Sequence, residues 1–155
     1  MRRALLIAAL LPLPALAEED HLSEIGGVRV LHAWTNAGDG DAARVYMEIE
    51  NEGDGPAELV AASAEGAETA TFVASPIRAE GGVPETLDGI LLPAGVAVAL
   101  EPRGLYLLLQ GVDASREEGG EMEMTLTFEP QGEVEVHVLV EAADATQHSH
   151  AGHSH

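Results

Sequence analysis

Residues 121–140 read Glu121-Met-Glu-Met-Thr-Leu-Thr-Phe-Glu-Pro-Gln-Gly-Glu-Val-Glu-Val-His-Val-Leu-Val140, with apolar and polar side chains alternating on both sides of the Pro130-Gln-Gly132 turn. A β-strand points successive side chains to opposite faces of its sheet. The alternation therefore predicts two antiparallel strands, each with one buried face, joined by a short connection.

The rest of the chain between Gly27 and Val140 repeats this pattern, and no segment has helical spacing over a useful length. Short strands separated by Gly, Pro, Asn and Asp clusters predict an all-β antiparallel sandwich or Greek-key barrel. The longest irregular loop is expected over 80–89. The expected strands are Val28–Trp34, Arg44–Asn51, Ala57–Ser63, Thr69–Ala74, Val96–Leu100, Leu105–Gln110, Glu121–Phe128 and Glu133–Val140.

The N-terminus has the pattern of an export signal. Arg2 and Arg3 precede an apolar stretch that ends at Ala15-Leu-Ala17, a small-x-small cleavage site. The apolar run is too short to span a membrane, which needs about 20 residues, so no membrane insertion is expected after cleavage. We expect a signal peptide at 1–17, a lead-in at 18–26, a β-sandwich domain at 27–141 and a flexible His-rich tail at 142–155, in a protein located in the periplasm.

Charge excludes several partners. Removal of residues 1–17 leaves five basic residues against 27 acidic ones, a formal charge of −22. Such a surface repels nucleic acids and anionic membranes and attracts cations or basic proteins. The chain contains no Cys, so neither disulfides nor thiolate metal ligands are expected.

Four imidazoles lie within the last eight residues, at His148, His150, His153 and His155. Neutral imidazole binds Cu(II) or Zn(II) through either ring nitrogen, and a His cluster needs only a chain that can bend. The sequence predicts a metal site in this tail, with copper as the first candidate and zinc as the second. The alternative is a polar tail that only promotes solubility.

The other His and Met residues are assigned by strand alternation. His137 is expected on the outer face of its strand. His32 should share a face with Val28, Val30 and Trp34 as a hydrogen-bonded residue at the margin of the core, with a metal ligand as the alternative. Met47, Met122 and Met124 alternate with outward polar residues and are predicted to fill the core. No catalytic constellation is present, so an enzyme is not expected.

Six short motifs follow one another along the body of the chain: Val30-Leu-His-Ala-Trp34, Val45-Tyr-Met-Glu-Ile-Glu-Asn51, Leu91-Leu-Pro-Ala-Gly95, Leu100-Glu-Pro-Arg-Gly104, Leu107-Leu-Leu-Gln-Gly-Val112 and Met124-Thr-Leu-Thr-Phe-Glu129. Their succession resembles the PCuAC family of periplasmic copper chaperones. It implies a cupredoxin-like Greek-key β-sandwich that holds Cu(I). It also implies delivery of copper for cytochrome oxidase assembly, together with Sco-type proteins.

The resemblance does not extend to the copper ligands. Family members carry a His, a later Met and a His-x-Met, and these positions correspond here to Val73, Pro84, Tyr106 and Leu108. Two functions stay open. One is a copper carrier that uses the tail histidines, and the other is a divergent domain without metal that acts as a protein-interaction module in metalloenzyme assembly.

Overall fold

The computed structural model describes residues 22–75, 82–112 and 115–149, and these form strands and connections without a helix. The strands are β1 (Leu22–Ile25), β2 (Val28–Asn36), β3 (Ala42–Asn51), β4 (Ala57–Ala64), β5 (Thr69–Ala74), β6 (Glu85–Leu87), β7 (Ile90–Leu92), β8 (Ala97–Leu100), β9 (Leu105–Gln110), β10 (Glu121–Glu129) and β11 (Gly132–Glu141). The all-β prediction is confirmed. Within the described ranges no helix is long and apolar enough to cross a bilayer. The predicted signal peptide lies outside the described residues.

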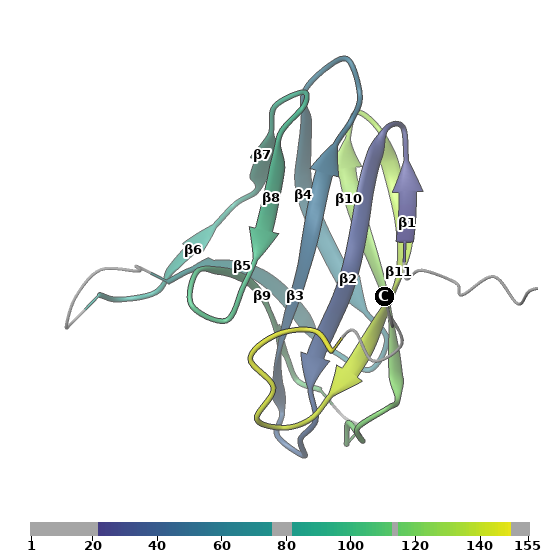
Figure 1. Cartoon of the computed structure of the whole chain (residues 1–155). Helices are drawn as coiled ribbons and strands as arrows, with labels where there is room; N and C mark the ends of the chain where they lie inside the picture. Colours follow the sequence, from purple (N-terminus) through teal and green to yellow (C-terminus); the bar gives the residue numbers. More distant parts are fainter. Residues whose placement is uncertain (1–21, 76–81, 113–114, 150–155) are drawn as a thin grey trace, which may run out of the picture.

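The strands form one continuous sheet that wraps around the core as a nearly closed barrel (Figure 1). Along the sheet the order is β6-β5-β9-β8-β3-β2-β11-β10-β4-β7, with β1 added beside β2. Most neighbours are antiparallel, whereas the last residues of β11 run parallel to the end of β2. This crossover brings the C-terminal strand beside the first long strand.

The eight predicted strands are all present, but three short ones were missed. The predicted irregular loop over 80–89 needs correction, because it contains β6, which pairs with β5 through Phe72 and Leu87. β1 and β7 are also only a few residues long. Strands this short carry too few alternations to be recognised by period alone.

The core consists of the inward row of each strand. Leu126 and Phe128 of β10 are fully buried, and Val136, Val138 and Val140 of β11 are buried as well. Met47 and Met124 are buried among them and Met122 packs against the same cluster, which confirms the expected core positions. His137 is exposed opposite Glu123 on the outer face, also as predicted.

The buried Arg116 holds the end of β2 and the beginning of β3 in place. The Arg116 guanidinium donates hydrogen bonds to the carbonyl oxygens of Asn36, Gly40 and Ala42 at 3.5, 3.3 and 3.2 Å. Its side chain is 8% exposed. Buried charge is tolerated where hydrogen bonds replace water, so this arginine fixes the end of β2 to which the C-terminal segment attaches.

Candidate metal centre

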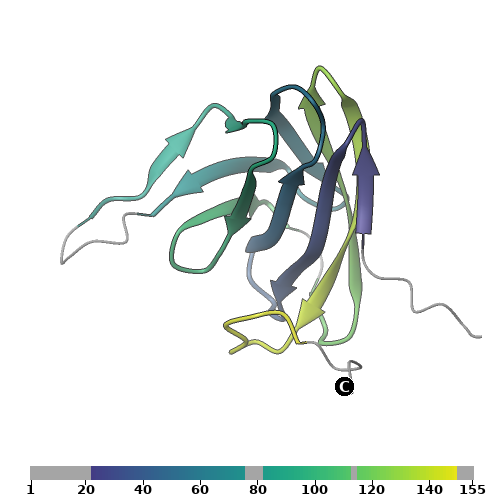
Figure 2. The same ribbon diagram turned by 45° about the horizontal axis from the view of Figure 1, so that its top comes forward.

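Residues 142–149, called here the C-terminal segment, lie against the end of β2 (Figures 1 and 2). The Asn36 amide donates hydrogen bonds to the carbonyl oxygens of Ala142 and Ala145, both at 3.0 Å. The Ala145 side chain packs against a buried aromatic cluster. The first part of the predicted tail, residues 142–149, therefore contacts the body, and a side-chain amide rather than an apolar stripe holds it there.

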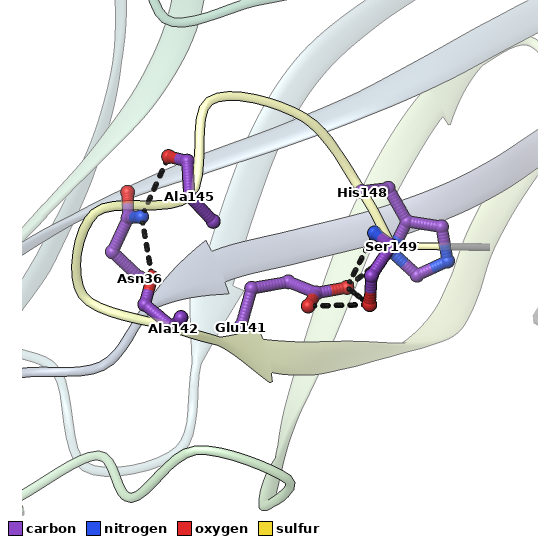
Figure 3. A network of polar contacts seen from close by, with 6 residues as sticks. All are labelled: Asn36, Glu141, Ala142, Ala145, His148 and Ser149. Atoms are coloured by element: carbon purple, nitrogen blue, oxygen red, sulfur yellow. Dashed lines mark hydrogen bonds and ion pairs between the residues drawn. The ribbon is translucent and has the colours of Figure 1, made fainter. Parts of the chain in front are cut away.

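Glu141 connects the same segment to the end of β11 (Figure 3). Its carboxylate accepts hydrogen bonds from the backbone N–H of Ser149 at 2.9 Å and from the Ser149 hydroxyl at 2.7 Å. Nδ1 of His148 lies 2.9 Å from Glu141 Oε1. Because the Glu141 side chain is only 9% exposed, the two Ser149 donors replace the water that a carboxylate requires. The first tail imidazole is thereby fixed on the body of the protein.

A second imidazole approaches from β2. The rings of His32 and His148 have centroids 5.4 Å apart and are tilted by 36°. His32 has a φ of 51°, a left-handed conformation that costs a residue with a Cβ about 1–2 kcal/mol. Such strain persists where the surrounding structure imposes it and is often found at functional sites.

A β-bulge explains why strand alternation misplaced His32. The pairing of β2 with β3 shifts between Leu31 and Trp34, so an extra residue is inserted in β2. Ala33 joins Val28 and Val30 in the main core, and Trp34 belongs to a separate cluster. His32 was expected to share a face with Val28, Val30 and Trp34. This expectation is wrong, because the alternation of β2 is interrupted after Leu31.

The two imidazoles line a groove of about 370 Å³, called here the His32 groove. Its other lining residues are Trp34, Met47, Glu48, Ala99, Leu100, Glu101 and Gln147. Two carboxylates therefore accompany two imidazoles on its walls. In the described ranges, no three His, Asp or Glu side chains are grouped closely enough to hold a metal ion. His150, His153 and His155, the other predicted ligands, lie outside the described residues.

Next to this groove lies an apolar cluster made of Trp34, Tyr46, Val73 and Tyr106, against which Leu108 packs. The rings of Trp34 and Tyr46 are in contact, with centroids 4.6 Å apart and planes tilted by 45°. The Arg44 guanidinium lies 4.8 Å above the Tyr106 ring. Burial raises the pKa of the Tyr46 hydroxyl, and the positive charge and hydrogen bond of Arg44 offset part of that rise.

Three of the four positions that the resemblance assigns to copper ligands meet in this cluster. Val73 pairs directly with Tyr106 across β5 and β9, and Leu108 lies two residues further along β9. The fourth, Pro84, lies in the exposed stretch before β6. Val73 and Leu108 are aliphatic and offer no electron pair to a metal, and Tyr106 carries a phenol oxygen in place of an imidazole.

Comparison with known proteins identifies a matching family and a relative that are both described as putative lipoproteins. The model of the LpqE-like family, described as "Putative lipoprotein LpqE-like", matches residues 28–140. The "Putative lipoprotein Lxx21020" of Leifsonia xyli subsp. xyli (strain CTCB07) is 29% identical over 118 residues, which cover 75% of this chain and 70% of that protein.

Solved PCuAC domains have the same fold. The copper-bound PCuAC domain from PmoF2 superposes with a TM-score of 0.70 at 27% identity, covering 79% of this chain and 98% of that domain. The apo PCuAC domain from PmoF1 gives a TM-score of 0.67 at 31% identity, covering 79% of this chain and 99% of that domain.

Proposed function

Because the chain belongs to the LpqE-like family, and its fold is that of PCuAC domains, we propose that it is a copper-binding, chaperone-like protein. It captures or delivers copper through its C-terminal histidines, His148, His150, His153 and His155. One solved relative at 27% identity is a copper-bound PCuAC domain, which supports copper as the cargo. Zinc is the second candidate, because imidazole ligands suit both ions.

The apolar cluster supports a change of ligand set. Val73, Tyr106 and Leu108 stand where the resemblance implies a His and a His-x-Met. Cu(I) favours soft thioether ligands, whereas imidazole alone suits Cu(II). Met47 and Met124 are 3% and 2% exposed in the main core. The tail therefore supplies nitrogen donors for an ion in its oxidised form.

The observation that carries the proposal is the position of His148. Its Nδ1 is held 2.9 Å from the buried Glu141 carboxylate, and a carboxylate on one nitrogen orients an imidazole and makes its other nitrogen a better ligand. A tail that only promoted solubility would gain nothing from such a contact. The body thus presents the first residue of the cluster in a defined orientation.

We further propose export by residues 1–17 and residence in the periplasm, where copper is passed towards cytochrome oxidase assembly with Sco-type proteins as partners. The family description and the Leifsonia relative both name lipoproteins, which supports an exported, envelope-associated protein. The 155 residues contain no Cys, so a thioether-linked lipid cannot be attached within them.

Calorimetric titration with Cu(II) and Zn(II) tests the tail. A variant ending at Ala145 keeps the Asn36 hydrogen bonds and the packing of Ala145, so its body should fold normally. We expect it to lose most of the tight binding, while the control His137→Ala, which removes an exposed imidazole elsewhere, binds as the full chain does. Equal affinity and stoichiometry in the shortened protein would refute the tail site.

A second candidate function is a protein-interaction module without metal. It is favoured by the exposed carboxylates on the outer face of the β10–β11 hairpin, which alternate with the buried row: Glu121, Glu123, Glu133 and Glu135. An acidic face attracts a basic partner. The same titration discriminates the two functions, because the module would bind neither ion tightly in either form.

A further inference from the structure

The apolar cluster lies on the outer face of the sheet. Val45 and Leu107 belong to the main core, whereas their chain neighbours Tyr46 and Tyr106 belong to the apolar cluster. Since successive residues of a strand point to opposite faces, both tyrosines project away from the main core. Trp34 pairs with Tyr46 across β2 and β3 and belongs to the same cluster. The barrel therefore carries a group of aromatic rings on its outside.

These outward rings are covered. Trp34, Tyr46 and Tyr106 are 5%, 3% and 4% exposed. The C-terminal segment supplies part of the cover, because Ala145 packs against the cluster, and Figure 1 shows the segment in yellow, crossing in front of β2 and β3. Its attachment is mainly polar, through the amide of Asn36 and the carboxylate at the end of β11. The segment is thus a cover held by hydrogen bonds.

The cover leaves space beside the rings. A groove of about 550 Å³ lies between residues 100–103 and residues 146–148, and Trp34 forms part of its wall. The C-terminal segment packs against the cluster with the methyl group of Ala145. A larger aliphatic side chain at that place would bury more apolar area against the same rings, and burial of apolar area favours binding.

We propose that the apolar cluster is a docking surface for a partner protein, and that the C-terminal segment covers this surface in the free protein. Trp, Tyr and Arg are the residues that most often dominate the binding energy of protein interfaces. All three types occur here, since the Arg44 guanidinium lies 4.8 Å above the Tyr106 ring. This inference goes beyond copper binding, because it does not depend on a metal at the tail histidines.

The contacts of the C-terminal segment indicate what the partner offers. The Asn36 amide donates to two backbone carbonyls, so the partner presents a stretch of peptide backbone. An apolar side chain takes the place of Ala145. Glu48 and Glu101 line the adjoining His32 groove, and the whole chain has a formal charge of −20, so the partner is basic. The occupant is therefore a protein segment with a large aliphatic side chain flanked by Lys or Arg.

The first test releases the cover in the full chain. Ala145→Asp should undock the C-terminal segment, because a carboxylate buried against aromatic rings without hydrogen bonds is unfavourable. Ala143→Asp is the matched control, since it adds the same charge at an exposed position of the same segment. Trp34 is the chain's one Trp, so its fluorescence reports on the cluster. Acrylamide should quench Trp34 more strongly in Ala145→Asp than in the wild type or in Ala143→Asp, and equal quenching would overturn the covering role.

The second test titrates a peptide and follows the fluorescence of Trp34. The probe is Lys-Ala-Ala-Lys-Leu-Thr-Gln, which copies residues 141–147 with Lys for the two acidic residues and Leu for Ala145. Ala145→Asp should bind it about 10-fold or more tightly than the wild type, because apparent affinity falls with the fraction of uncovered surface. Ala143→Asp should match the wild type. The same peptide with Ala instead of Leu should bind about 10-fold or more weakly, since apolar area is lost.

Three outcomes contradict the proposal. Equal affinity for the peptide in all three proteins would overturn the competition with the C-terminal segment. A lack of saturable change at Trp34 in Ala145→Asp would overturn the docking surface. Self-association of Ala145→Asp without peptide, measured by sedimentation, would identify a second copy of the chain as the occupant and refute the basic partner.

A measurement on the wild-type chain keeps the inference falsifiable if Ala145→Asp does not fold. The backbone N–H groups of Ala145 and Ser149 donate hydrogen bonds within the docked C-terminal segment. A large excess of the peptide should displace the segment, so both amides should exchange faster with deuterium, while amides of β10 keep their protection. Unchanged exchange at Ala145 and Ser149 would refute displacement by a partner.

Discussion

Replacement of Asn36 by Ala should release the C-terminal segment while leaving the barrel folded. The Asn36 amide makes two hydrogen bonds to this segment, to the carbonyls of Ala142 and Ala145 at 3.0 Å each. At about 1 kcal/mol net for each bond, their loss costs about 2 kcal/mol, which lowers the ratio of docked to undocked segment about 30-fold. Since the segment lies outside the main core, most of this cost affects local docking rather than global unfolding.

Hydrogen exchange of backbone amides measures the release directly. The N–H groups of Ala145 and Ser149 donate within the docked segment, so both should lose protection in Asn36→Ala. A suitable control is Gln131→Ala, which removes an amide that donates to the Pro56 carbonyl far from the segment. Unchanged exchange at Ala145 and Ser149 would refute the view that Asn36 holds the C-terminal segment.

Three further predictions concern pH and oxidation state. Affinity for Cu(II) should fall steeply between about pH 7 and pH 5, because protons compete for imidazole nitrogens. A binding curve that stays flat down to pH 5 would assign the ion to carboxylates instead. The chain ending at Ala145, titrated anaerobically, should fail to take Cu(I) from a chromophoric chelator, and firm retention of one equivalent would reassign Met122 and Met124 as ligands. Burial raises the pKa of Tyr46, so the folded state favours the protonated hydroxyl and unfolding free energy should decrease as pH rises through about 10. Denaturation series from pH 8 to 11 should show a smaller decrease in Tyr46→Phe, and identical decreases would contradict the assignment.

Sequence reasoning recovered the barrel because alternation is a local signal. The limits of β5 and β9 agree with the predicted ranges, and the β10–β11 hairpin was read correctly to within one residue at each end. β10 and β11 each have one buried face, whereas β5 and β9 bury neighbouring residues on both faces, at Phe72 and Val73 and at Tyr106 and Leu107. Burial on one side and water on the other impose the period of two that the sequence displays.

The candidate site was harder to predict because its contacts are specific and non-local. The bulge in β2 depends on register with β3, which alternation within one strand does not reveal. Docking of residues 142–149 depends on one amide, Asn36, and one buried carboxylate, Glu141. A sequence signal did exist in the polar Asn36 at the end of an apolar strand, but its partners lie more than 100 residues away.

The end of β2 contributes Trp34 to the apolar cluster and His32 to the pair of imidazoles. Trp34 packs with Tyr46, Val73 and Tyr106 on one side, and it also lines the His32 groove on the other. The proposed site therefore lies next to the positions that the resemblance assigns to copper, at the same end of the barrel. The side chains at those positions provide no soft ligand for copper. The proposed site nevertheless lies at the same end of the barrel. The tail imidazoles that we propose as ligands are nitrogen donors, which suit Cu(II) better than Cu(I).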